Sequence, residues 1–272
     1  MSKISNYKNK FDIEKEFKSI LHDKEHGASY LASKLGKIIL NSGLDQKQTD
    51  EVLSKLNILL RLLKKEHPAL ILLHNLVIEL INGIEKKGPS KIPELINAFF
   101  LKEEKTVSIA SDFLNHLSFS QVITFSHSST LLKTFYNLKH NPIFFVLESN
   151  PGGEGVFMFR ELEKKGYEAH LIPDLTFSLF INKETVVVTG FDQLSPKFFV
   201  NKVGTKPLII TSKMLGESTI IIGSSNKFTP EIVLPDKKTD FKGVQLSFFE
   251  KVELEYVDVI ITDKGAVSKR KK

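Results

Sequence analysis

The chain has 272 residues, 41% of them hydrophobic and 26% charged, and its formal net charge is +6 at pH 7. This length allows a large core in one or two domains, and the lack of cysteine in the sequence excludes disulfides, thiolate metal sites and thiol nucleophiles. No apolar run reaches the roughly 18 residues of a membrane span, and the N-terminus has no signal-peptide core. We therefore expect a soluble, cytoplasmic protein without a membrane partner.

Part of the positive charge lies in the terminal sequence SKRKK, which we interpret as a solvated tail. The remaining lysines are dispersed and are not interleaved with aromatic residues. This pattern does not indicate a nucleic-acid partner.

The first part of the chain, residues 1–117, has the spacing of amphipathic helices. Apolar residues recur every three to four positions, for example over residues 52–63. Helix-breaking residues interrupt the pattern at 41–43, 67–68 and 88–90. Short connections between amphipathic helices favour an antiparallel bundle, so we expect an N-terminal helical domain over residues 1–117.

Two helix starts of this bundle contain histidine. His26 precedes Gly27, Ala28 and Ser29, and the exposed N–H groups of such a small-residue helix start can hold an anion. His67 stands before a proline at the start of the next helix. As isolated features, both are more often ordinary helix starts than binding sites.

After residue 117 the pattern changes to short apolar runs separated by helical stretches. The predicted strands cover residues 122–125, 143–147, 169–172, 186–188, 219–222 and 257–261. The predicted helices between them cover residues 130–138, 156–165, 175–181 and 205–215. This alternation predicts an α/β domain with a Rossmann-like, doubly wound parallel sheet, which we expect over residues 118–272.

Polar loops follow the predicted strands. Their sequences are SHSST at 126–130, ESNPGGEG at 148–155, PD at 173–174, GFD at 190–192 and SSNK at 224–227. The crossover rule places the carboxyl ends of parallel strands along one edge of the sheet, where open α/β sheets bind their ligands. Because five polar loops at one edge are far less expected by chance than any one of them, we predict a binding site there.

Two of these loops allow more than one interpretation. The serine-rich loop 126–130 suits a phosphate, since hydroxyl and N–H groups gather at a helix N-terminus, but a multiply capped helix explains it equally well. The glycine-rich loop 148–155 lacks the P-loop lysine and does not match the dinucleotide fingerprint. Glu154 would repel a phosphate on this loop, so we interpret its glycines as shaping the backbone.

The stretch 186–205 contains the most specific candidates. Its three successive valines predict a strand buried on both faces, and Asp192 falls just beyond that strand. Asn201 and Lys202 supply an amide and a cation that can hold an anionic or polyhydroxylated ligand. From this segment alone, an Asp192 that only closes a turn and a solvated Lys202 form an equally good interpretation.

Other catalytic arrangements find no support. Ser126 and His127 are adjacent at a helix start and no GxSxG elbow surrounds them, which argues against a serine–histidine dyad. No HExxH or comparable spacing indicates zinc. We predict neither a metal nor a cofactor.

Taken in order, the segments ITFSHSST, ESNPGGEG, LIPD, GFDQ, NKVGT, SSNKF and IITDKG resemble the initiation factor 2B family. That family comprises the alpha, beta and delta regulatory subunits of the translational guanine-nucleotide exchange factor. It also includes isomerases of methylthioribose 1-phosphate and ribose 1,5-bisphosphate. The resemblance covers about residues 121–265, and in the bundle HGAS and HPALILLHNL are similar to the family's arginine-containing segments.

The resemblance implies roles for the matching positions. Asp192 corresponds to the acid of the isomerases, and the implied ligand contacts are Gly27, Ala28, Ser29, Ser128, Ser129, Thr130, Asn201, Lys202 and Lys227. Ser126 stands where the isomerases carry their catalytic cysteine, and a serine hydroxyl needs a dedicated base. His26 and His67 stand where they carry phosphate-clamping arginines, whose bidentate fork a largely neutral histidine cannot form.

Our leading hypothesis is a binding protein similar to the initiation factor 2B regulatory subunits, catalytically weak or inactive, with a pocket for a sugar phosphate or a nucleotide monophosphate. The resemblance implies a homodimer through the C-terminal domain and leaves a translation-factor partner open. The alternative is an aldose–ketose sugar-phosphate isomerase, with Asp192 as the acid and His127 as a substitute base. A third hypothesis is a scaffold with a vestigial pocket.

Overall fold

The computed structural model describes residues 13–23 and 27–268. The chain divides into two compact units, Met1–Phe99 and Phe100–Lys272. None of the described helices has the length and apolarity that crossing a membrane requires.

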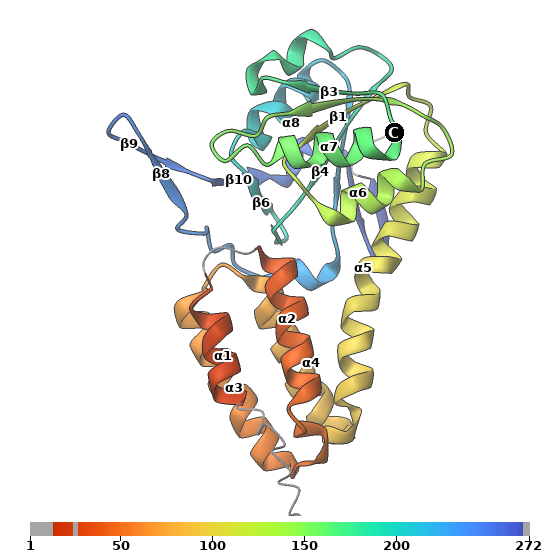
Figure 1. The fold of residues 1–272 in the computed structure, drawn as a ribbon. Helices are drawn as coiled ribbons and strands as arrows, with labels where there is room; N and C mark the ends of the chain where they lie inside the picture. The colour runs from red at the N-terminus through yellow and green to blue at the C-terminus, as the bar shows by residue number, and fades with distance from the viewer. Residues whose placement is uncertain (1–12, 24–26, 269–272) are drawn as a thin grey trace, which may run out of the picture. The chain divides into compact units, whose positions relative to one another are not determined.

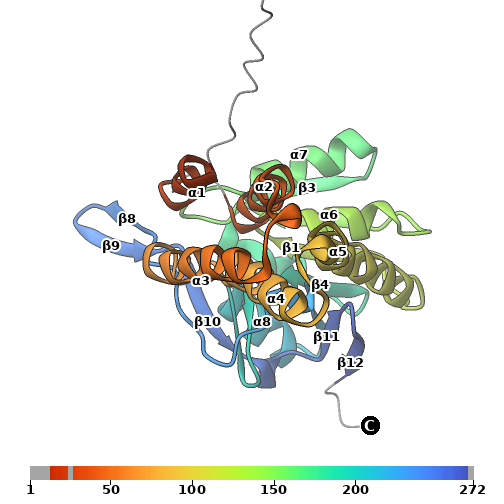
Figure 2. The ribbon, with the colours of Figure 1, turned by 90° about the horizontal axis from the view of Figure 1, so that it is seen from below.

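The N-terminal unit is built of helices. They are α1 (Ile13–Leu21), α2 (Ala28–Asn41), α3 (Thr49–Glu66), α4 (Ile71–Lys87) and the beginning of α5 (Ile92–Asn115), with short 3₁₀ turns η1 (Leu44–Gln46) and η2 (Pro89–Lys91). Helix α1 contacts α2 and α3, and α4 contacts the same two helices, so that they pack as a bundle (Figure 2). The apolar stripe predicted for α3 is buried, since Val52, Leu56, Leu59 and Leu63 are all at most 1% exposed. This burial confirms the periodicity in the sequence.

The second unit contains a sheet whose strands run in the order β12-β11-β7-β4-β1-β2-β3. These strands are β1 (Gln121–Phe125), β2 (Ile143–Leu147), β3 (Ala169–Ile172), β4 (Thr185–Gly190), β7 (Ser218–Ile222), β11 (Val259–Thr262) and β12 (Gly265–Ser268). Their pairings are parallel, except that β12 is antiparallel to β11. The chain moves outward from β1 to β3 and then returns to β4 on the other side of β1. The predicted Rossmann-like α/β fold is thus confirmed, and its topological switch point lies between β1 and β4.

Both faces of this sheet are covered, which explains the unbroken apolar runs (Figure 1). On one face Val186 and Val188 pack with α5, α6 (Ser129–Tyr136) and α7 (Gly155–Lys165). On the other face Val187 packs with α8 (Thr205–Met214) and with the 3₁₀ helix η3 (Asp174–Leu179). Successive strand residues point to opposite faces, so a strand buried on both sides has no polar position to alternate with.

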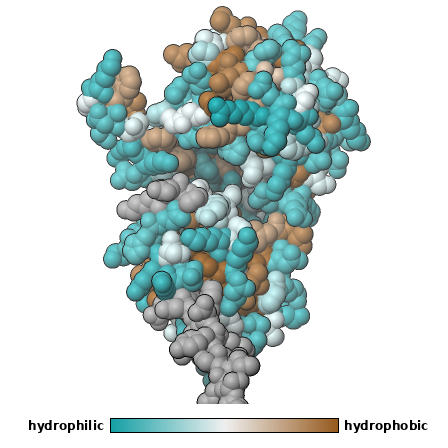
Figure 3. Space-filling model, viewed as in Figure 1, coloured by the Kyte–Doolittle hydropathy of each residue, from teal (hydrophilic) through white to brown (hydrophobic). Residues whose placement is uncertain are grey.

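Several elements were not predicted from the sequence. Strands β5 (Gln193–Leu194), β6 (Phe198–Lys202) and β10 (Phe249–Glu253) form a small antiparallel sheet in the order β10-β6-β5. Strands β8 (Lys238–Phe241) and β9 (Val244–Ser247) form a hairpin that projects from the rest of this unit (Figures 1 and 3). Its side chains Phe241 and Val244 are more than half exposed. The segment predicted as a helix over 175–181 is the 3₁₀ helix η3.

The change from helices to sheet falls between α5 and β1, whereas the two compact units meet within α5, between Phe99 and Phe100. The boundary between α5 and β1 is a change of secondary structure, whereas the boundary within α5 separates two compact bodies of packed residues. A domain boundary at 117/118 stays a prediction.

Candidate functional site

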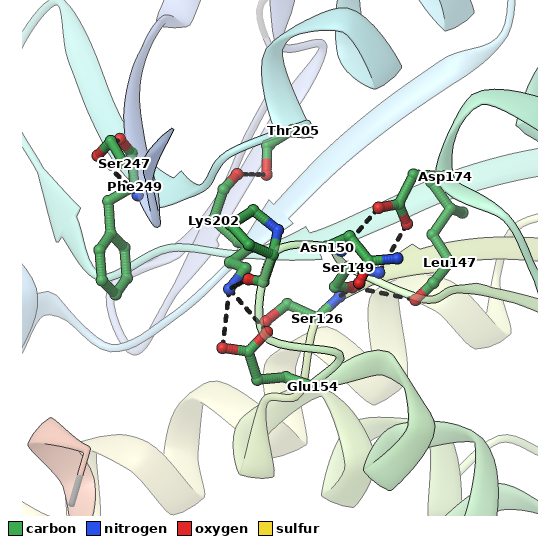
Figure 4. A network of polar contacts seen from close by, with 11 residues as sticks. Ser126, Leu147, Ser149, Asn150, Glu154, Asp174, Lys202, Thr205, Ser247 and Phe249 are labelled. Atoms are coloured by element: carbon green, nitrogen blue, oxygen red, sulfur yellow. Dashed lines mark hydrogen bonds and ion pairs between the residues drawn. The ribbon is translucent and has the colours of Figure 1, made fainter. Parts of the chain in front are cut away.

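Two serines at the carboxyl ends of adjacent strands are tied together (Figure 4). Ser126 follows β1 and Ser149 lies two residues beyond β2. The main-chain N–H of Ser126 donates to the Ser149 hydroxyl at 2.6 Å, and this hydroxyl donates to the carbonyl of Leu147 at 3.0 Å. Both serines have a positive φ, 65° and 67°, which is unfavourable for a residue with a side chain. The bond therefore holds two strained turns in register.

A carboxylate from the third strand end fixes the glycine-rich loop. Asp174, two residues beyond β3, accepts the main-chain N–H of Ser149 at 2.6 Å and that of Asn150 at 2.7 Å. Charge-assisted bonds of this kind are short and strong. The charge of Asp174 thus orders the loop after β2.

Lys202 is the most enclosed cation of the site. Its side chain, at the end of β6, is 3% exposed. Its ammonium donates to the carbonyl of Pro151 and, at 2.8 Å, to Oε1 of Glu154, whose Oε2 lies 2.7 Å away. The ring of Phe248 lies 4.2 Å from Nζ. Burial lowers the pKa of Lys202, while the Glu154 charge raises it. The interpretation of Lys202 as a solvated lysine is therefore wrong.

The loop reaches Lys202 because Gly152 has no side chain. A Cβ at this position would lie 2.7 Å from Nζ of Lys202 and 2.8 Å from the carboxylate of Glu154. Gly152 also has a φ of 121°, which favours glycine. The glycines do shape the backbone, and they do so around the lysine.

Asp192 lies just beyond β4, at the switch point. Its N–H donates to the carbonyl of Val200 at 2.8 Å, which ties this loop to β6. Among the residues that the structure describes, none forms a hydrogen bond with its carboxyl group. Although the residue retains some exposure, the protein packed around the carboxyl raises its pKa, with Lys227 and Lys202 opposing and Glu154 adding to the rise. Burial thus makes the Asp192 carboxyl harder to ionise than an ordinary aspartate, and the two lysines offset part of this effect.

Lys227 joins the fifth strand end to the same place. It ends the 3₁₀ turn η4 (Ser225–Lys227) that follows β7, and its Nζ donates to the carbonyl of Phe191 at 2.8 Å. The turn itself is held by Asp263, which accepts the N–H of Ser225 at 2.6 Å and its hydroxyl at 3.0 Å. Lys227 is therefore placed next to Asp192.

The serine-rich loop caps a helix. The hydroxyl of Ser128 accepts the N–H of Leu131 at 3.4 Å, Ser129 is partly exposed, and Thr130 is buried. A Cβ on Gly190, the last residue of β4, would lie 3.3 Å from the Ser128 hydroxyl. The loop therefore caps α6 and also lies at the switch point. Both interpretations, a capped helix and a phosphate site, stay open.

The predicted contact Asn201 is turned inward. Its amide donates to the Thr205 hydroxyl at 3.0 Å, and this hydroxyl donates to the carbonyl of Lys202 at 2.7 Å. Asn201 is 7% exposed. These bonds fasten β6 to the start of α8.

The N-terminus of α8 already carries an anion from the chain. Oε1 of Glu250 accepts the N–H groups of Gly204 and Lys206, each at 2.8 Å. Burial raises the pKa of Glu250, while these N–H groups lower it. A carboxylate here satisfies both the orphan donors and the helix dipole.

The remaining predicted residues belong to the N-terminal unit. Gly27 is the N-cap of α2, and Ser29 is exposed. Nε2 of His67 lies 3.1 Å from the carbonyl of Ile20, and the carbonyl of His67 lies 3.0 Å from Nε2 of buried His74. The ring of His67 is thus engaged inside this unit. His26 lies outside the described residues.

The second unit therefore brings Ser126, Asp192, Lys202 and Lys227 to one edge of the sheet. Sequence reasoning missed the contributions of Ser149, Asp174 and Glu154. Ser149 and Asp174 are polar residues that lie two positions beyond the end of a strand. This position in the sequence could have identified them as site residues. In the described part of the chain, no cluster of histidine and acidic residues is arranged to hold a metal ion.

The chain is similar to known proteins. The profile of the Initiation factor 2 subunit family matches residues 25–245. A protein of Pyrococcus horikoshii described as a putative translation initiation factor eIF-2B subunit 2-like is 26% identical over 256 residues, which cover 89% of this chain and 91% of that protein. The ribose 1,5-bisphosphate isomerase of Archaeoglobus fulgidus is 26% identical over 206 residues, covering 70% of this chain and 61% of that protein.

The fold is also that of a solved structure. The crystal structure of the Pyrococcus horikoshii OT3 translation initiation factor eIF-2B superposes with a TM-score of 0.78 at 23% identity, covering 94% of this chain and 97% of that one.

Proposed function

Because the chain belongs to the Initiation factor 2 subunit family, we propose that it is a regulatory or binding member with weak or no catalysis. Its strand-end site would hold a sugar phosphate or a nucleotide monophosphate. One observation carries this proposal. Lys202, Lys227 and Asp192, whose pKa is raised by burial, gather at the switch point, while the position that corresponds to the isomerases' catalytic cysteine is Ser126. The site keeps groups for a polar anion and lacks the thiol.

The proposal is tested by measuring binding and turnover on the same samples. Ribose 1,5-bisphosphate, methylthioribose 1-phosphate and adenosine monophosphate are titrated by calorimetry, and the two sugar phosphates are then followed by NMR for conversion. We expect binding without conversion. Conversion at about 1 s⁻¹ or faster, in the range of ordinary enzymes, together with its loss in Asp192→Asn, would overturn the proposal.

An isomerase is the second candidate, and the state of Asp192 favours it. A carboxyl whose pKa is raised by burial can donate a proton to a ring oxygen or a carbonyl. His127 is the candidate base near Ser126. Its side chain is exposed, and partial desolvation lowers its pKa while the charge of Glu161 raises it. If wild-type protein isomerises a sugar phosphate, His127→Asn should lower the rate about 10²-fold or more.

We also propose a homodimer formed through the C-terminal domain, a translation-factor partner and a cytoplasmic location. Support comes from the family and from the names of the relatives as translation initiation factors. Light scattering coupled to size-exclusion chromatography of the full chain tests the dimer. A monomeric mass for the full chain would refute it.

A further inference from the structure

Groups of the chain itself enclose the ammonium of Lys202. It donates to the carbonyl of Pro151 and to Oε1 of Glu154, Oε2 of Glu154 lies 2.7 Å from Nζ as an ion-pair contact, the ring of Phe248 lies on a further side, and the side chain is only 3% exposed. Glu154 supplies the anionic acceptors of this set. A ligand phosphate that contacts Lys202 must therefore take the place of the Glu154 carboxylate.

The two partners differ in their freedom to move. The side chain of Glu154 is 32% exposed, whereas that of Lys202 is 3% exposed. The partly exposed side chain of Glu154 can turn towards water, although its Oε2 is buried in the present contact, whereas a buried ammonium that loses its partner is strongly disfavoured. Exchange of anions at Lys202 thus proceeds by movement of Glu154.

The backbone beneath Glu154 is fixed. A Cβ on Gly155, the next residue, would lie 1.8 Å from the carbonyl oxygen of Leu147, so α7 begins in direct contact with the end of β2. Asp174 and Ser149 hold the preceding part of the loop. Only the side chain of Glu154 is left to move.

We propose that Glu154 is a built-in competitor for the anion site at Lys202 and sets the charge that a ligand must bring. A phosphomonoester dianion, with more charge than a carboxylate and three terminal oxygens, displaces Glu154. A neutral sugar or a monocarboxylate does not. This inference rests on the proposed function in that the ligand carries a phosphate.

The test compares variants of equal charge. Ribose 1,5-bisphosphate and inorganic phosphate are titrated by calorimetry, at constant ionic strength, into wild-type protein, Glu154→Gln and Glu163→Gln. Glu163 lies on α7 with an exposed side chain, so its replacement reproduces the change in net charge. We expect both probes to bind Glu154→Gln about tenfold more tightly than wild type, and Glu163→Gln to stay within about twofold.

Two further variants keep the test decisive. Glu154→Asp retains the charge but withdraws the carboxylate by one methylene, and it should bind both probes more tightly than wild type even if Glu154→Gln fails to fold. Lys202→Met added to Glu154→Gln should abolish the gain.

The outcomes separate this inference from the proposed function. Equal or weaker binding of both probes to the folded Glu154 variants overturns the inference, and weaker binding of ribose 1,5-bisphosphate alone would make Glu154 a contact to its hydroxyls. If no protein binds ribose 1,5-bisphosphate, the proposed function loses its support. In that case the affinity for inorganic phosphate decides the inference about Glu154. Tighter binding of phosphate by the Glu154 variants than by wild type supports it, and equal affinities overturn it.

Discussion

Ser126 and Ser149 stabilise each other's left-handed conformations through one hydrogen bond of 2.6 Å between the ends of β1 and β2. Ser149→Ala removes the acceptor and leaves the N–H of Ser126 without its partner, which should cost about 1–3 kcal/mol in the free energy of unfolding. Ser149→Gly should cost roughly 1 kcal/mol less, because glycine accepts a positive φ without strain. Urea denaturation measures both. The exposed Ser178→Ala is the control, and an equal loss in all three variants would contradict the assignment.

A thiol introduced at position 126 tests the proposal that Ser126 limits turnover. We expect Ser126→Cys to convert ribose 1,5-bisphosphate or methylthioribose 1-phosphate at least about 10²-fold faster than wild type, the usual contribution of one positioned proton-transfer group. The added Asp192→Asn should remove this gain. If Ser126→Cys binds the sugar phosphate and yet converts none of it, the serine is not what limits the chemistry.

Asp192 should cost stability at neutral pH. Burial raises its pKa in the folded protein above the ordinary value of 3.8, so its favourable contribution to stability is present below that value and is lost as pH rises through the folded pKa. Near pH 7, Asp192→Asn should therefore be more stable than wild type by about 1–3 kcal/mol in the free energy of unfolding. Its melting temperature should be higher accordingly. The difference should vanish near pH 4. Exposed Asp112→Asn is the control, and a gain of the same size at both pH values would contradict this explanation.

The buried His74 should make the helical unit sensitive to acid. Burial lowers the pKa of His74 below 6.5, so this histidine binds a proton more readily in the unfolded chain than in the folded one. Stability should fall as pH drops below about 6.5, with a slope of at most about 1.4 kcal/mol per pH unit from this residue. His74→Asn should flatten the slope in urea denaturation series, and the exposed His22→Asn should leave it unchanged. An unchanged slope in His74→Asn would rule this residue out.

The glycine-rich loop offers a matched pair of substitutions. Gly152 and Gly153 both have positive φ, 121° and 71°, but an added Cβ meets the Lys202–Glu154 pair only at Gly152 and has nothing within 4 Å at Gly153. Gly153→Ala should cost about 1 kcal/mol for the backbone alone. Gly152→Ala should cost about 2–3 kcal/mol and also change phosphate binding. Calorimetry and urea denaturation check both effects, and identical behaviour of the two variants would show that the contact is unimportant.

Local pattern predicted most of the parallel sheet. Runs such as Val186 to Val188 predict a strand that is buried on both faces, and the end of this strand at Gly190 places Asp192 at the carboxyl edge of the sheet. The helical stripe of α3 was predicted for the same kind of reason. The start of α3 could not be predicted in this way, because its N-cap is Gln48, whose side chain forms no capping hydrogen bond.

The environment of Lys202 could not be predicted, because it depends on contacts between distant segments. Strand β6 pairs with β10, about fifty residues later, in the register Asn201 with Glu250. Nothing near Lys202 in the sequence announces that Glu154 will neutralise it. From the sequence we expected Glu154 to repel a phosphate. In the structure its carboxylate lies beside the ammonium of Lys202.

The carboxylate of Glu250 at the start of α8 has a consequence for redesign of the pocket. A short neutral side chain there, as in Glu250→Ala, would leave the N–H groups of Gly204 and Lys206 without the acceptor that they now have. Removal of this one native charge would thus create a second phosphate-binding position at the start of α8, which could be used to engineer binding of a doubly phosphorylated molecule.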